Sequence, residues 1–482
     1  MPGGVAGAVA FPRTIGEVAA LVTGSRQVLP IGAQSSLTGG ATPRGHLVIS
    51  TRALTGITQT SEDTVRVGAG VVLADLQRSL AAWGRWYPPA PTFDGAFIGG
   101  TIATNAAGAA TFKYGSTRRW VESILVVLAD GSALEVRRGE VSASPEGWFE
   151  LERVSGEVVP ILIPTYQMPA VAKLSAGYFA APGMDLIDLF IGSEGTLGVI
   201  VEATLRVIPR PRSCVALVAC ESDAQVVAAT AALRSEAERS WQGDGPLNVS
   251  AIEYMGERAL AVVPDEAFVH AGVTRPPATT SPLLVQIEVE DDGDTALARL
   301  GEVLDQCGIH EDPRVALPGD DRTAAQMFGL REAVPAAVNG RVAEAQSRLN
   351  RLIHKVAGDL VVPFDRLAES LALYRAVFER WELDYAIWGH VSDGNLHPNL
   401  VPRTFADVET GYLALGEIVA GVMAMGGAPL AEHGVGRNKR HLLRALYGDR
   451  GIEEMRAVKR ALDPEWKLAA GVLFSQTLDD PA

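Results

Sequence analysis

"GAFIGGTIATNAAG" occupies residues 95–108 and combines glycines with small hydroxyl side chains. Three more segments of this kind precede residue 212: "PIGAQSSLTGGATP" at 30–43, "KYGSTRRWVES" at 113–123 and "GYFAAPGMDLIDLFIGSEGTLG" at 177–198. Glycine-rich backbone lets several N–H groups converge on one anion. A single segment is typical of a tight turn, but four in one block indicate a site for a phosphate or pyrophosphate.

The motifs of two common nucleotide-binding folds do not occur in these segments. None is a G-x-G-x-x-G that follows a strand, and none is a G-x-x-x-x-G-K-[ST] loop. The runs around them alternate between strand-like and amphipathic helical patterns, which predicts an α+β domain. Predicted strands are 27–33, 47–50, 64–70 and 123–136, the last a hairpin turned at Asp130-Gly131, and predicted helices are 14–25 and 72–84.

The rest of the chain has a different character, with few glycine clusters. The proline- and arginine-rich residues 208–213 are typical of a linker. After them a strand-then-helix pattern occurs twice, which predicts a compact α+β, ferredoxin-like unit. These elements are strands 214–220 and 282–290 and helices 223–240 and 294–308, and further helices are predicted at 408–427 and 452–464. We therefore expect three parts, 1–212, 213–415 and a C-terminal helical segment, 416–482.

Composition and charge narrow the class of function. The 482 residues carry a net charge of -15, which argues against nucleic acid as a partner. No run approaches the roughly 20 apolar residues of a membrane span, and the start lacks a secretory signal. Three cysteines indicate a reducing compartment and not a disulfide framework. We expect a cytoplasmic protein. The sequence leaves open whether it contacts the inner membrane peripherally, forms homo-oligomers or belongs to a larger complex.

The four glycine-rich segments, in their order and spacing, resemble the FAD-binding domain of the vanillyl-alcohol oxidase-type (PCMH-type) flavoproteins. The matching residues are 30–40, 98–108, 113–118 and 192–198. The resemblance implies that the first loop cradles the pyrophosphate of FAD and that the second and fourth segments line the flavin. Ala33 and Gln34 stand where that family commonly has glycines. No histidine lies in the four segments, His46 being the nearest, so we expect noncovalent FAD.

The resemblance implies one set of cofactor-binding positions. They are Pro30, Gly32, Ala33, Gln34, Ser35, Ser36, Leu37, Thr38, Gly39, Gly99, Gly100, Thr101, Ala103, Thr104, Asn105, Gly108, Tyr114, Gly115, Glu194, Gly195, Gly198 and Ile200.

"WGHVSDGNLHPN", at 388–399, places two of the eight histidines around an Asp-Gly pair. A two-residue turn at Asp393-Gly394 would put His390 directly opposite His397, with Asn399 on the same face. Two imidazoles could then converge on one metal ion. A pair of hydrogen-bonded structural histidines is the alternative, and a longer loop would shift the pairing.

"AEHGVGRNK", at 431–439, could complete such a site. Glu432 would supply a carboxylate to a two-histidine, one-carboxylate set, which suits Zn²⁺, Mn²⁺ or Fe²⁺. His433 would then remain free as a general base near neutral pH. In isolation, this segment is more typical of a helix end or loop.

The two histidine segments together resemble one branch of the same flavoprotein family, which includes D-lactate dehydrogenase, D-2-hydroxyglutarate dehydrogenase and the flavin subunit of glycolate oxidase. By this resemblance His390, His397 and Glu432 hold a divalent metal, Zn or Mn, and His433 is the base. Ser392 replaces a glycine of the branch pattern.

The same branch implies anchors for the carboxylate of a 2-hydroxy acid. Arg331, Lys355 and Asn399 match such positions, although a solvated surface charge is the alternative for each cation. Pro335 stands where some relatives carry a threonine that helps bind a second carboxylate. Residues 469–472 read Ala-Ala-Gly-Val and depart from the usual N-P-G-K.

These inferences predict FAD-dependent, metal-assisted oxidation of a D-2-hydroxy acid, D-lactate-like or glycolate-like, to the 2-oxo acid by hydride transfer to flavin N5. The acceptor that reoxidises the flavin stays open among quinone, cytochrome, electron-transfer flavoprotein and oxygen. Two alternatives remain: a metal-free flavin oxidase of a phenol or sugar acid, and a flavin-carrying subunit of a larger electron-transfer complex.

Overall fold

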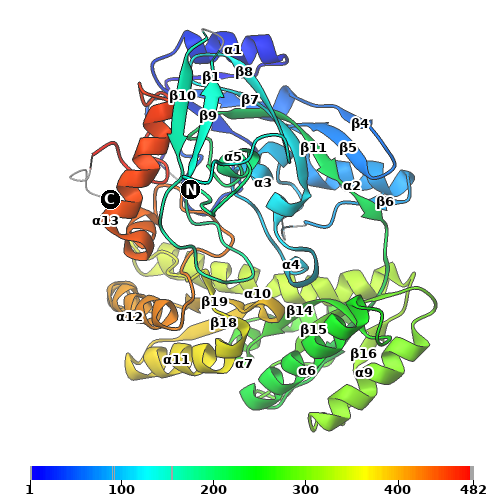
Figure 1. The fold of residues 1–482 in the computed structure, drawn as a ribbon. Coiled ribbons are helices and arrows are strands. Elements are labelled where there is room, and N and C mark those ends of the chain that lie inside the picture. Colours follow the sequence, from blue (N-terminus) through cyan, green and yellow to red (C-terminus); the bar gives the residue numbers. More distant parts are fainter. Residues whose placement is uncertain (1–2, 90, 92, 154–155, 478–482) are drawn as a thin grey trace.

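The first half of the chain builds two larger sheets and two strand pairs around the glycine-rich segments. A computed structural model describes residues 3–89, 91, 93–153 and 156–477 (Figure 1). A parallel three-stranded sheet has the order β1-β3-β2, and an antiparallel five-stranded sheet has the order β4-β5-β11-β7-β8. The strands are β1 (Ala8–Ala10), β2 (Val28–Ile31), β3 (Leu47–Ser50), β4 (Ile57–Gln59), β5 (Thr64–Gly68), β7 (Val121–Val127), β8 (Ala133–Arg137) and β11 (Val199–Arg206).

Short elements complete this half. They are α1 (Ile15–Thr23), α2 (Leu73–Ala82), β6 (Arg85–Trp86), α3 (Ile98–Ala103), α4 (Thr111–Tyr114), β9 (Trp148–Glu152), β10 (Val158–Leu162), α5 (Ile187–Phe190) and β12 (Ile208–Pro209). The two strand pairs are β10-β9 and β12-β6. The predicted hairpin is confirmed: Val127 pairs with Ala133, and Gly131 turns the chain at φ +84. The predicted linker 208–213 is ordered by strand pairing, because β12 pairs with β6 and the next strand begins at Arg212.

The second half is an antiparallel seven-stranded sheet of order β16-β13-β15-β14-β18-β19-β17. Its first four strands follow the order of a ferredoxin-like unit, with α6 and α9 as the two crossover helices. The strands are β13 (Arg212–Val218), β14 (Asn248–Met255), β15 (Leu283–Val289), β16 (Arg314–Ala316), β17 (Leu360–Val361), β18 (Tyr385–His390) and β19 (Asn395–Leu400).

Helices cover both faces of this sheet, because alternate strand residues point to opposite sides. Cys214 and Ala216 of β13 pack in the core with α6, α9, α11 and α12, whereas Val215 packs with α7, α8 and α10. The helices are α6 (Asp223–Trp241), α7 (Glu257–Ala261), α8 (Asp265–Ala271), α9 (Asp294–Gln306), α10 (Asp321–Arg348), α11 (Leu367–Arg380) and α12 (Phe405–Ala424). Among the described residues, no helix has the length and apolarity needed to cross a bilayer.

The last helix, α13 (Arg440–Leu462), returns to the first half. Its Leu443, Met455 and Val458 share a core with Tyr178, and Figure 1 shows it beside β10. The departing residues 469–472 also close onto this half, since the N–H of Ala469 donates to Val28. The expected fold, an α+β flavin domain with a ferredoxin-like cap and a C-terminal helical segment, is confirmed.

Candidate active site

A cavity of about 530 Å³ lies among the glycine-rich segments. Its wall comes from the loop after β2, from α3 with the residues before and after it, and from residues 194–200. Two residues of the E-H-G segment, Glu432 and His433, close one part of the wall. Backbone and small side chains dominate the lining, as the close approach of a phosphate and a flat ring requires.

The structure places most of the expected cofactor positions in this wall. Those that line the cavity are Pro30, Gly32, Ala33, Gln34, Ser35, Ser36, Leu37, Gly99, Gly100, Thr101, Ala103, Thr104, Glu194, Gly195, Gly198 and Ile200. Those outside the lining are Thr38, Gly39, Asn105, Gly108, Tyr114 and Gly115. Lining residues that were not among the expected cofactor positions include Thr51, Pro91, Phe93, Ala96 and Phe97.

Two of the residues outside the lining support the wall from behind. Asn105 is left-handed at φ +48, and its side chain accepts the N–H of Arg118 and donates to the carbonyl of Leu174. The Tyr114 hydroxyl points away from the cavity and donates to Glu288 in the second half, at 2.6 Å. These contacts hold the cavity segments against their neighbours.

Glu194 connects the cavity wall to the E-H-G segment. Its two oxygens accept the N–H groups of Val435 and Gly436, at 2.7 and 2.9 Å. Burial raises the pKa of Glu194 to about 7, although the two N–H groups lower it. The same carboxyl group therefore belongs to the cavity wall and positions the segment with Glu432 and His433.

The hairpin that carries the two histidines differs from the predicted one. His390 pairs with Asn395, and Trp388 pairs with His397, so the prediction that His390 directly faces His397 is wrong. The reason is that Val391–Asp393 forms a 3-10 turn before Gly394, which makes the connection four residues long. His390 and His397 are still diagonal neighbours on one face, with ring centroids 5.7 Å apart.

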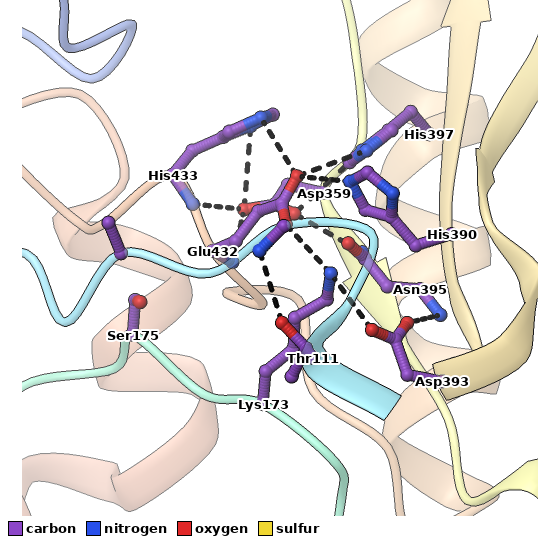
Figure 2. A network of polar contacts seen from close by, with 12 residues as sticks. Thr111, Lys173, Ser175, Asp359, His390, Asp393, Asn395, His397, Glu432 and His433 are labelled. Atoms are coloured by element: carbon purple, nitrogen blue, oxygen red, sulfur yellow. Dashed lines mark hydrogen bonds and ion pairs between the residues drawn. The ribbon is translucent and has the colours of Figure 1, made fainter. Parts of the chain in front are cut away.

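Glu432 lies at the centre of a cluster of polar side chains (Figure 2). Its Oε1 atom faces the Nε2 atoms of His390, His397 and His433, at 3.2, 3.4 and 3.7 Å. Burial raises the pKa of Glu432, but Lys173 and His390 oppose this and hold it well below the ordinary value. The cluster thus sets one ionised oxygen among three imidazole nitrogens.

Asp359 orients the segment that follows this carboxylate. Its Oδ2 atom accepts the backbone N–H groups of Glu432 and His433, at 3.1 and 2.9 Å. Its Oδ1 atom accepts the amide of Asn395, and Lys439 lies 3.6 Å from Oδ2. The Nδ1 atom of His433 is 3.5 Å from Oδ2, so each ring nitrogen of His433 faces one carboxylate, Asp359 at Nδ1 and Glu432 at Nε2.

His390 is oriented by a second buried carboxylate. Its Nδ1 atom contacts Glu253, which also forms an ion pair with Arg331. Burial raises the pKa of Glu253, yet Arg331 and His390 outweigh it and lower that pKa to about 2. A carboxylate on Nδ1 leaves the Nε2 atom of His390 directed at Glu432, as in the second shell of metal-bound histidines.

His433 joins the cluster to the cavity. Its side chain keeps 31% of its surface exposed and lines the cavity wall, and its ring stacks on His397 with centroids 5.2 Å apart. Burial, opposed by Asp359, lowers the pKa of His433 to about 4. The ring is therefore neutral at pH 7, although this lowered pKa makes it a weaker base than an ordinary histidine.

The three expected substrate anchors have different surroundings. Arg331 is buried against Glu253, so its charge is already balanced. Burial lowers the pKa of Lys355, whose ammonium lies 5.7 Å from the centre of the Trp388 ring. The amide of Asn399 donates to the carbonyl of His397, and its buried oxygen has no hydrogen-bond partner among the described residues.

The cluster fits a divalent metal ion. Ligand atoms at about 2.0–2.1 Å from a tetrahedral zinc ion lie roughly 3.3 Å from one another, close to the two shortest nitrogen-to-Glu432 distances. The ligand atoms of Asp359, His397, Glu432 and His433 lie within 4.8 Å of one another, a group that does not include His390. Since hydrogen bonds already occupy Asp359, it suits the role of an orienting group better than that of a ligand.

Three residues of the cluster were missed in the sequence. Lys173 is a single cation in a long irregular segment, which gives no signal. Glu253 is a charge inside the otherwise buried strand β14, and Asp359 directly precedes the buried strand β17. An acid at such a buried position is a signal that could have indicated both.

Comparison with known proteins gives the same picture. Residues 6–137 match the FAD binding domain family, and residues 208–473 match the C-terminal domain of FAD linked oxidases. In the solved structure of alkyldihydroxyacetonephosphate synthase, the fold superposes with a TM-score of 0.62 at 16% identity, over 96% of this chain and 75% of that one.

Relatives at higher identity span nearly the whole chain. D-2-hydroxyglutarate dehydrogenase of Xanthomonas citri is 30% identical, over 98% of this chain and 90% of its own length. Glycolate oxidase subunit GlcD of Bacillus subtilis is 27% identical (97% and 89%), and D-lactate dehydrogenase of Anaerostipes hadrus is 28% identical (94% and 86%). The resemblance found in the motifs is confirmed, and the chain belongs to the FAD-linked oxidases, as a flavin-dependent oxidoreductase of the vanillyl-alcohol oxidase type.

Proposed function

We propose that this chain oxidises a D-2-hydroxy acid of the D-lactate or glycolate type to the 2-oxo acid, with noncovalent FAD and a divalent metal, Zn²⁺ or Mn²⁺. The observation that carries the proposal is the position of His433, which lines the flavin cavity while its Nε2 lies 3.7 Å from Glu432. The relatives named for 2-hydroxy acids support the substrate class.

The proposal gives each polar residue a separate task. His390, His397 and Glu432 would hold the metal, and His433 would take the hydroxyl proton at Nε2. When bound, the metal would act as a Lewis acid toward the substrate oxygens, and FAD would accept the hydride. Asp359, 3.5 Å from Nδ1, would hold the ring proton on that nitrogen and leave Nε2 as the acceptor. Burial keeps that ring neutral at pH 7.

Recognition of the substrate carboxylate would fall to Lys355, Arg331 and Asn399. Lys355 is the strongest of the three candidates, because its ammonium forms no ion pair with a carboxylate in the described part of the chain and lies over the Trp388 ring. Arg331 already forms an ion pair with Glu253, so we assign it a smaller role in binding the substrate carboxylate. Reduced flavin would then pass its electrons to a quinone, a cytochrome, an electron-transfer flavoprotein or oxygen.

Anaerobic bleaching of the flavin absorbance tests the proposal. The purified holoenzyme is mixed with matched D- and L-2-hydroxy acids, and with phenols and sugar acids. We expect rapid bleaching by a small D-2-hydroxy acid only. Bleaching by a phenol or sugar acid would replace the proposal with a metal-free oxidase. No bleaching by any of them would favour a flavin-carrying subunit of a larger complex.

A further inference from the structure

Lys173 is a fully buried cation that the proposed chemistry does not use. Its side chain has 0% of its surface exposed and lies between Glu432 and Asp393 (Figure 2). Its ammonium donates to Glu432 Oε2 at 2.7 Å and forms an ion pair with Asp393 Oδ2 at 3.2 Å. Two carboxylate oxygens within 3.2 Å therefore compensate the charge of this buried ammonium.

The chain directly after Lys173 is fixed by three hydrogen bonds. The N–H of Ser175 donates to the carbonyl of Leu430, and its hydroxyl donates to the carbonyl of Thr104 on the flavin side. The carbonyl of Leu174, between Lys173 and Ser175, accepts a hydrogen bond from the side-chain amide of Asn105. An ammonium on this anchored segment has a defined position relative to both the flavin wall and Glu432.

The two oxygens of Glu432 have different surroundings. Oε1 faces the three imidazole nitrogens, whereas Oε2 is engaged by Lys173. Asp393 points an oxygen at the same ammonium, so both carboxylates lie within 3.2 Å of one nitrogen atom. Carboxylate oxygens in such a position are themselves good ligands for divalent cations, and a carboxylate can bind a metal through one or both of its oxygens.

We propose that Lys173 is a positioning residue, which restricts Glu432 to one donor oxygen and keeps Asp393 away from the metal, so that coordination positions stay open for the substrate. This inference rests on the metal site proposed above. An ammonium supplies three donors and no acceptor, so it can hold two carboxylates beside it without itself becoming a metal ligand. It donates a hydrogen bond to Glu432 Oε2, whereas its contact with Asp393 Oδ2 is an ion pair only. Catalytic metal sites need such open positions.

Removal of the ammonium is expected to add ligands. In Lys173→Met, Glu432 Oε2 and Asp393 become available, and a neighbouring positive charge is lost. We expect metal affinity to rise, by a factor comparable with the about 10- to 100-fold loss that follows when a supporting outer-shell partner is removed. The added ligands occupy positions that the substrate needs, so the KM of the hydroxy acid is expected to rise at least about tenfold, with a smaller change in kcat.

The test uses Co²⁺-loaded holoenzyme and the difference spectrum beyond the flavin bands. The d–d absorption of Co²⁺ weakens as its coordination number increases, so Lys173→Met is expected to absorb less than the natural protein. Lys459→Met is the matched control. Its lysine is equally buried and pairs with Asp463 at 2.8 Å, away from the cluster, so its Co²⁺ spectrum is expected to stay unchanged.

A double variant keeps the test decisive if Lys173→Met does not fold. Lys173→Met with Asp393→Asn removes one buried negative charge together with the positive one, and it still releases Glu432 Oε2. We expect it to show the same loss of Co²⁺ absorption in weaker form. A natural Co²⁺ spectrum and KM in a folded variant would overturn the role of Lys173. Failure of the natural holoenzyme to bind Co²⁺ would instead contradict the proposed metal site.

Discussion

The flavin cavity and the polar cluster are adjacent, yet they are built in opposite ways. The cavity wall consists mainly of backbone and small side chains from segments that are continuous in the sequence. The cluster consists of long charged or imidazole side chains from several distant segments. Side-chain changes should therefore be tolerated in the cavity and severe in the cluster, whereas changes in backbone freedom should have the reverse effect.

The largest effect is expected for Glu432→Gln. The change removes the charged oxygen that faces three imidazoles, and with it the metal. Since Lewis-acid stabilisation is worth several kcal/mol, flavin reduction by the hydroxy acid should slow by about 10³-fold or more. Stopped-flow absorbance and metal analysis of the same sample measure both losses.

The matched control for this change is Glu202→Gln, an acid on β11 that is 41% exposed and pairs with Arg66. It should leave both metal content and reduction rate unchanged. Full metal content and an unchanged reduction rate in Glu432→Gln would contradict the expected sensitivity of the cluster, because the cluster would then tolerate loss of its central charge.

His433→Gln is expected to have the next largest effect. A positioned general base typically contributes about 10²-fold or more, so the reduction rate should fall by about that factor. The metal should remain, because His433 is the most distant of the three imidazoles from Glu432, at 3.7 Å. His310→Gln, an exposed histidine beside Asp305, is the control. Loss of metal together with rate would make His433 a ligand.

Gly195→Ala tests the opposite property in the cavity wall. Gly195 has φ +74, and an added Cβ would lie 2.7 Å from Cγ of Pro30. A non-glycine residue in such a conformation costs about 1–3 kcal/mol, so the Kd of FAD should rise by roughly 5- to 150-fold. Fluorescence titration of the apoprotein with FAD measures this change. Gly16→Ala, in α1 with open space around it, should bind FAD normally.

Gln34→Gly is expected to have the smallest effect. Gln34 is left-handed at φ +56, and glycine would relieve about 1–2 kcal/mol of backbone strain. The change also removes the hydrogen bond from the side chain to the carbonyl of Ala41, worth about 0.5–1.5 kcal/mol. The two terms nearly offset, so FAD affinity should change by less than about fivefold. A larger loss would show that the Gln34 side chain itself binds the cofactor.

The same contrast explains what the sequence could predict. The cavity was predictable because each of its loops is one contiguous motif. Phe93 was missed because it lies outside the quoted segments, and Phe97 because it precedes the residues 98–108 that carry the resemblance. In the cluster, His390, His397 and Glu432 belong to recognisable segments. Lys173 and Glu253 do not, since only the tertiary fold brings them there. The predicted register of the histidine hairpin was wrong because an Asp-Gly pair does not by itself set the length of the turn.

The most direct test of the account is flavin reduction with and without the metal. The holoenzyme is treated with a chelator, freed of metal, and mixed anaerobically with the D-2-hydroxy acid that bleaches it best. We expect FAD to stay bound, reduction to stop, and Zn²⁺ or Mn²⁺ to restore it. Reduction at the original rate in the metal-free holoenzyme would contradict the metal role of His390, His397 and Glu432.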